Sequence, residues 1–138
     1  MIDTQAALIY IMVMVAAADN NMADAELHII GDIVNRLPAF VEYDQKRLTK
    51  DLKDCAVILG RETGLEEALK SVKAAIPAKL RETAYALACD VAAAGAAAGR
   101  ELSQETLRLL EMLRHRLGVD RLTAAAIERG ARARFTPL

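Results

Sequence analysis

The sequence is poor in aromatic side chains and in residues that interrupt a helix. Its 138 residues contain no tryptophan, three tyrosines, two phenylalanines and only three prolines. Strands favour aromatic and β-branched residues, whereas alanine, which is abundant in this chain, favours helices. The composition therefore predicts an all-α protein. The length fits one domain, and we expect it to cover residues 1–138.

The chain also lacks an excess of charge of either sign. Eighteen lysines and arginines face nineteen aspartates and glutamates, which gives a formal net charge of −1. This balance argues against a nucleic-acid-binding protein that relies on bulk positive charge, and against a disordered acidic tail. We therefore expect no nucleic-acid partner.

Long hydrophobic runs and paired cysteines are missing as well. The apolar run 6–18 is shorter than the roughly 20 residues that cross a bilayer, and residues 1–5 carry an acid but no lysine or arginine. It predicts a buried core helix, with no membrane insertion. Cys55 and Cys89 are isolated, with no CxxC motif, which fits a reducing cytoplasm.

The hydrophobic periodicity and the capping signals predict seven helices and no strand. The expected helices cover residues 4–18, 24–37, about 45–60, 64–76, 77–94, 104–118 and 121–134. Asp44, Ser103 and Asp120 are the expected N-caps of the third, sixth and seventh. The connector 38–43 is expected to fill the core with Phe40, Val41 and Tyr43.

The first and fifth helices are expected to be central, because both are apolar on nearly all sides. The two halves of the chain also match at an offset of eighty residues: Met22 falls on Leu102 and Glu26 on Thr106. Each half is then a buried helix, a short loop and an amphipathic helix. The alternative to an internal repeat is that any two amphipathic helices can be aligned in this way.

Residues 19–26 form the densest group of oxygen-bearing side chains, and such oxygens suit hard cations. Asp24 and Glu26 lie in the first turn of the second helix, where negative charge is stabilised without a metal. Asp19 lies at the negative end of the first helix and needs a backbone donor, an arginine or a cation. We name Asp19, Glu26 and Asp90 as candidate metal ligands, with Asp24 a weaker one.

Asp90 is an isolated acid, alone among the uncharged residues 83–99. It either occupies a solvated stripe of its helix or reaches the acidic loop and shares a partner with Asp19. The run 128–134 is basic; it is either a solvated helix end, favoured by the helix dipole, or a patch for an anion or a partner. No Ser or Cys nucleophile accompanies either histidine, so we expect no enzyme.

Several segments resemble the tellurite-resistance TerB family. They are residues 7–19 with Met22, Glu26 and 37–38, and in the second half residues 81–87, 107–111 and 124–134. The hallmark is an Asp followed seven residues later by a Glu, matched by Asp19 and Glu26. The second half departs from it, with Gly99 and Thr106 at those positions; Asp90 with Glu101 or Glu105 could then substitute.

The resemblance implies an all-helical fold of two related halves in a cytoplasmic protein tied to tellurite and stress resistance. It further implies a protein-interaction module, with a weak site for Ca²⁺, Mg²⁺ or Mn²⁺ in the acidic loop 19–26 and no enzymatic activity. Two alternatives stay open. One is a purely structural, self-associating domain without metal. The other is thiol-dependent binding of tellurium oxyanions by Cys55 and Cys89.

Overall fold

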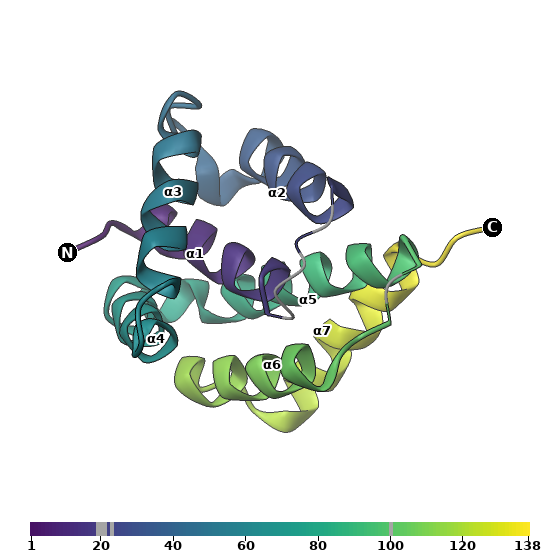
Figure 1. Cartoon of the computed structure of the whole chain (residues 1–138). Helices are drawn as coiled ribbons and strands as arrows, with labels where there is room; N and C mark the ends of the chain where they lie inside the picture. The colour runs from purple at the N-terminus through teal and green to yellow at the C-terminus, as the bar shows by residue number, and fades with distance from the viewer. Residues whose placement is uncertain (19–21, 23, 100) are drawn as a thin grey trace.

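A computed structural model describes residues 1–18, 22, 24–99 and 101–138 of the chain (Figure 1). These residues form seven α-helices, two short 3-10 helices and no strand, so the all-α prediction is confirmed. The α-helices are α1 (Thr4–Ala16), α2 (Asp24–Arg36), α3 (Arg47–Leu59), α4 (Gly64–Ala75), α5 (Arg81–Ala97), α6 (Gln104–Leu117) and α7 (Arg121–Arg134). The 3-10 helices are η1 (Pro38–Phe40) and η2 (Ala78–Leu80).

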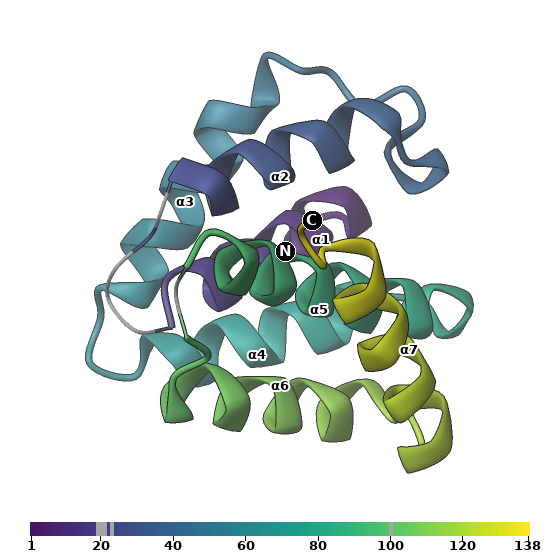
Figure 2. The same ribbon diagram turned by 90° about the vertical axis from the view of Figure 1, so that its right-hand side faces the viewer.

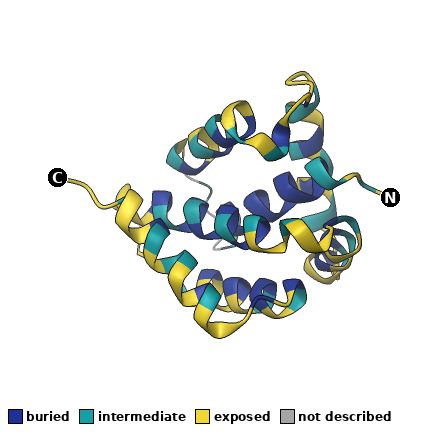
Figure 3. Ribbon diagram, turned by 180° about the vertical axis from the view of Figure 1, so that it is seen from behind, coloured by how far each residue is buried: buried dark blue, intermediate teal, exposed yellow. Residues whose placement is uncertain are grey.

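Helices α1 and α5 form the centre of the fold, as their composition predicts. The two helices contact each other; α1 also packs against α3 and α4, and α5 against α2, α6 and α7. Every residue from Ala6 to Ala16 is buried, and in Figure 3 the exposed residues lie on the outer faces of the surrounding helices. Figure 2 shows α2 on one side of the central pair and α6 on the other.

Side-chain caps fix where three of these helices begin. Ser103 and Asp120 accept hydrogen bonds from backbone N–H groups three residues later, which confirms both predicted caps. Asp3 caps α1 in the same way, through a 2.8 Å bond from the Ala6 N–H that the sequence analysis missed. Asp44 instead accepts a bond from the Lys46 N–H, so α3 begins later than expected, at Arg47.

Gly118 ends α6 and turns the chain towards α7. Its φ of 68° lies in the left-handed region, and the Val119 N–H donates to the carbonyl of Arg114. This pattern of bonds is the Schellman motif, which a side chain at Gly118 would strain. The tight turn brings α7 back along α5, with which it packs.

The internal repeat is visible in the helix boundaries. Helix α6 begins eighty residues after α2, and α1 shifted by eighty residues falls entirely within α5. The repeat-related residues Glu26 and Thr106 are both buried, although both are polar. The repeat-related positions 26 and 106 are therefore both buried, and both lie beside α5.

Some sequence expectations need correction. Val41 is 70% exposed, so the connector fills the core with Phe40 and Tyr43 only. The Phe40 and Tyr43 rings meet edge to face, whereas Val41 is exposed to solvent. The spacing of Leu107, Leu110, Leu113 and Leu117 predicts one buried stripe on α6, but Leu107 is 51% exposed, while Leu109 is buried. The fifth predicted helix is divided: Pro77 precedes η2, and α5 continues through Gly95 to Ala97.

Among the described residues, no helix combines the length and the apolar character that a membrane crossing requires.

Candidate functional site

The predicted acidic residues fall in different surroundings. Asp19 lies outside the described residues. Asp24 is exposed in the first turn of α2, and Glu26, in the same turn, is 5% exposed. Glu26 lies against Gly95 of α5: a Cβ atom placed on Gly95 would come within 3.3 Å of the Glu26 Oε2 atom. The absence of a side chain at Gly95 therefore makes room for the buried carboxylate.

A small cleft surrounds Glu26 where the two halves of the chain meet. Its walls include Glu26 from α2, Gly95 from α5, Thr106 from α6 and Glu101 from the segment before α6. Its volume is about 10 Å³, roughly the space of one water molecule. The Ser103 and Thr106 hydroxyl oxygens, 3.0 Å apart, share a hydrogen bond beside it. The cleft thus brings the repeat-related residues Glu26 and Thr106 together.

Asp90 has a partner that differs from both expectations, a solvated stripe of its helix and a partner shared with Asp19. Its carboxylate forms an ion pair and hydrogen bond with the Arg134 guanidinium at the end of α7, forty-four residues away. Asp90 thus ties α5 to α7. Within the parts of the chain that the structure describes, no group of three or more His, Cys, Asp or Glu side chains is arranged to hold a metal. The metal assignment to Asp19, Glu26 and Asp90 stays a prediction.

A large pocket lies between α5, α6 and α7, and is called here the α5–α6–α7 pocket. Its volume is about 420 Å³. It is lined by Tyr85, Cys89, Ala92, Ala93, Ala96, Ala97, Leu102, Leu107, Leu110, Glu111, Glu128, Ala131, Arg132, Phe135, Thr136 and Pro137. Most of these side chains are apolar, and the volume lies within the usual range of ~300–1,000 Å³ for small-molecule sites.

The pocket exists because one face of α5 is made of alanine. Ala92, Ala93, Ala96 and Ala97 are too short to reach the neighbouring helices, so α5 leaves space where longer side chains would pack. Leu102 and Leu107 border this space and are exposed to solvent, and Phe135 comes from the segment after α7. Ala92, Ala96 and Leu102 also line the Glu26 cleft, so the two hollows share a wall.

A polar contact lies in the wall of the α5–α6–α7 pocket. The hydroxyl of Tyr85, a residue that is 1% exposed, donates a hydrogen bond of 2.6 Å to the Glu128 carboxylate. Burial, and then this bond to Glu128, raise the pKa of Tyr85 above its usual value. The phenol therefore stays protonated and serves as a donor that joins α5 to α7.

The two cysteines are both buried. Burial raises the pKa of the Cys55 thiol to about 12, and burial is also the main reason that the pKa of Cys89 is raised to about 12. Because the thiolate is the reactive form, both groups are poor nucleophiles at neutral pH. This environment does not favour thiol chemistry on tellurium oxyanions.

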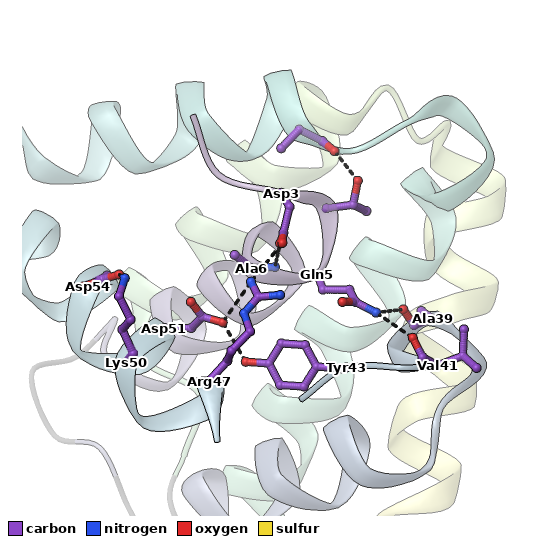
Figure 4. A network of polar contacts seen from close by, with 12 residues as sticks. Asp3, Gln5, Ala6, Ala39, Val41, Tyr43, Arg47, Lys50, Asp51 and Asp54 are labelled. Atoms are coloured by element: carbon purple, nitrogen blue, oxygen red, sulfur yellow. Dashed lines mark hydrogen bonds and ion pairs between the residues drawn. The ribbon is translucent and has the colours of Figure 1, made fainter. Parts of the chain in front are cut away.

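A second polar cluster joins the start of α1 to α3 (Figure 4). The Tyr43 hydroxyl donates to the buried Asp51 carboxylate at 2.6 Å, and Arg47 lies 3.5 Å from Asp51 and 2.9 Å from Asp3. The Arg47 guanidinium also lies over the Tyr43 ring. Each charge here has a partner of opposite sign, so the cluster closes the fold and offers no unsatisfied group to a ligand.

Comparisons of the chain with protein-family models, with curated proteins and with solved structures found no match. The resemblance to the TerB family therefore stays a prediction. The fold and the site define the chain, over its described residues, as an all-α helical bundle that contains a large, mostly apolar pocket.

Proposed function

We propose that this chain is a non-enzymatic binding module that holds an apolar group of another molecule in the α5–α6–α7 pocket. The observation that carries the proposal is the pocket itself: about 420 Å³ of mostly apolar space on a bundle whose centre is otherwise tightly filled. Leu102 and Leu107 are the kind of exposed apolar side chains that a ligand would cover.

The chemistry of the pocket suits binding better than catalysis. Cys89 is held as a thiol, Glu128 accepts a hydrogen bond from Tyr85, and Glu111 is paired with Arg114. A nucleophile needs an adjacent base, and an acid–base catalyst needs a pKa near the working pH. Among the pocket groups whose pKa is shifted, we find no nucleophile with an adjacent base and no acid–base group with a pKa near neutral pH.

The resemblance to the TerB family supports the same kind of role. It implies an interaction module in the cytoplasm, with protein partners or self-association, and a connection to tellurite and stress resistance. Light scattering of the purified chain measures the self-association. A host lacking the gene, challenged with tellurite, tests the connection to resistance.

A second candidate function, binding of a divalent cation, is favoured by the Glu26 cleft. The buried Glu26 carboxylate, Glu101 and the Thr106 hydroxyl are oxygen ligands of the kind that Ca²⁺, Mg²⁺ and Mn²⁺ prefer. They are too few for a complete calcium site, so Asp19 would have to contribute. Millimolar Ca²⁺ or Mn²⁺ should then raise the melting temperature of the wild type but not of Asp19→Asn or Glu26→Gln. If the metal changes the melting temperature by the same amount in all three chains, this candidate function is refuted.

The test of the pocket uses an uncharged apolar probe, N-phenyl-1-naphthylamine, whose fluorescence rises when it leaves water. Ala93→Trp fills the pocket, and Ala126→Trp adds the same side chain to an exposed position of α7 outside it. We expect probe binding to the wild type and to Ala126→Trp, and at least a tenfold loss in Ala93→Trp. Equal binding by all three chains would refute the proposal.

A further inference from the structure

The charges around the α5–α6–α7 pocket are unequally satisfied. Three charged side chains line it: Glu111, Glu128 and Arg132. Glu111 forms ion pairs with Arg114 at 2.8 Å and with His115 at 3.2 Å. The Glu128 carboxylate accepts a hydrogen bond from the Tyr85 hydroxyl, which is uncharged. Arg132 forms no ion pair with any residue that the structure describes, although Glu128 lies one helical turn before it on α7.

Arg132 lies beside the apolar part of the pocket. Arg132 is exposed and carries a guanidinium, whose N–H groups match a carboxylate in two parallel hydrogen bonds. The alanine wall of α5 and the Phe135 side chain lie in the same hollow. A molecule that filled this space and carried a negative charge at one end would cover apolar surface and pair with Arg132 at once.

We infer that the α5–α6–α7 pocket binds an amphipathic carboxylate of the fatty-acid class. The alkyl chain lies against the alanines of α5 and the leucines beside α6, and the carboxylate pairs with Arg132. This inference rests on the proposed function, since it names the ligand class of that same pocket. It also assigns a role to the basic run 128–134, as an anion-binding patch with Arg132 as its contact and Arg134 engaged by Asp90.

The size of the charge effect follows from the exposure of Arg132. An exposed ion pair contributes at most about 1 kcal/mol, which corresponds to roughly a fivefold change in dissociation constant. The alkyl chain therefore supplies most of the affinity, and Arg132 supplies the preference between head groups. Raising the salt concentration should weaken the preference without removing the binding.

The test compares three ligands that share a ten-carbon chain: decanoate, 1-decanol and decyltrimethylammonium, each below its micelle concentration. Calorimetric titration into the full chain should rank them in that order of affinity. Arg132→Gln should weaken decanoate binding about fivefold and leave 1-decanol unchanged. The matched control, Arg129→Gln, removes the same charge from α7 outside the pocket and should change neither.

The outcomes separate this inference from the proposed function. Equal affinity of the three ligands, or no effect of Arg132→Gln, would overturn the assignment of an anion while leaving an apolar pocket. Decanoate binding that survives Ala93→Trp would show that the pocket is not the site and would overturn both. Circular dichroism checks that Ala93→Trp is folded; if it is not, Ala97→Trp fills the same wall from an exposed position.

Discussion

The hydrogen bond between Tyr85 and Glu128 gives the sharpest stability prediction. The change Tyr85→Phe removes one hydroxyl from a side chain that is almost completely buried, and keeps the ring in place. The lost bond is short, at 2.6 Å, and its acceptor is a carboxylate. Hydrogen bonds to charged groups contribute ~1.5–3 kcal/mol. Because Glu128 is only half-buried and water can replace the donor, the lower end of this range applies.

We therefore expect Tyr85→Phe to lower the free energy of unfolding by about 1.5 kcal/mol, or the melting temperature by roughly 5 °C for a chain of this length. Urea unfolding followed by circular dichroism measures the difference. The control is Tyr10→Phe, at a residue that is 3% exposed and for whose hydroxyl the structure describes no hydrogen bond; its loss should be below about 0.5 kcal/mol. Equal losses in the two variants would refute the role of the Glu128 bond.

A double-mutant cycle with Glu128→Gln isolates the interaction from the other effects of each change. The two substitutions should be non-additive by about 1 kcal/mol, because the second removes a partner that is already lost. Additive effects would mean that the hydroxyl and the carboxylate contribute independently.

Two further predictions concern alkaline stability and helix glycines. Cys55 and Cys89 have folded-state pKa values of about 12, against an ordinary value of 9.0, so folding favours the protonated thiols. The stability that this protonation contributes is complete below pH 9 and is lost as the pH rises towards 12. Over this pH window the free energy of unfolding should fall by up to about 1.4 kcal/mol per pH unit for each thiol. The double variant Cys55→Ala, Cys89→Ala should show a smaller slope when urea unfolding is measured at several pH values. An unchanged slope would contradict the prediction. Gly31→Ala should stabilise the chain by about 0.5–1 kcal/mol, because a Cβ atom there meets nothing within 4 Å. Gly95→Ala should gain clearly less, because its Cβ atom would lie 3.2 Å from the Glu26 Cδ atom; equal gains would show that Glu26 moves freely.

Much of the fold could be predicted from the sequence, because its signals are local. The caps at Ser103 and Asp120 depend on residues three positions apart, and the buried character of α1 follows from an uninterrupted apolar run. The offset of eighty residues located both related halves. Helix ends are harder to predict: the sequence places the end of the first helix at Ala18, whereas α1 ends at Ala16.

The pocket could not be predicted, because it depends on which helices become neighbours. In the sequence, the alanines of α5 favour close packing against a neighbouring helix. Whether a neighbour comes that close depends on how α6 and α7 are placed, and the sequence near α5 does not determine their placement. Leu107 matches the periodicity of the buried stripe of α6 but lies at the edge of the pocket. Asp90 is an isolated acid in the sequence, but its partner Arg134 lies on a helix that sequence spacing alone does not place beside it.

The most direct test of the central claim is a map of amide chemical shifts in the labelled chain during titration with N-phenyl-1-naphthylamine. A ligand in the α5–α6–α7 pocket should shift the amides around Ala93, Leu107 and Arg132, and leave those around Tyr43 and Asp51 unchanged. Shifts that centre on α2 and α3, or that spread evenly over the chain, would contradict the assignment of the pocket as the binding site.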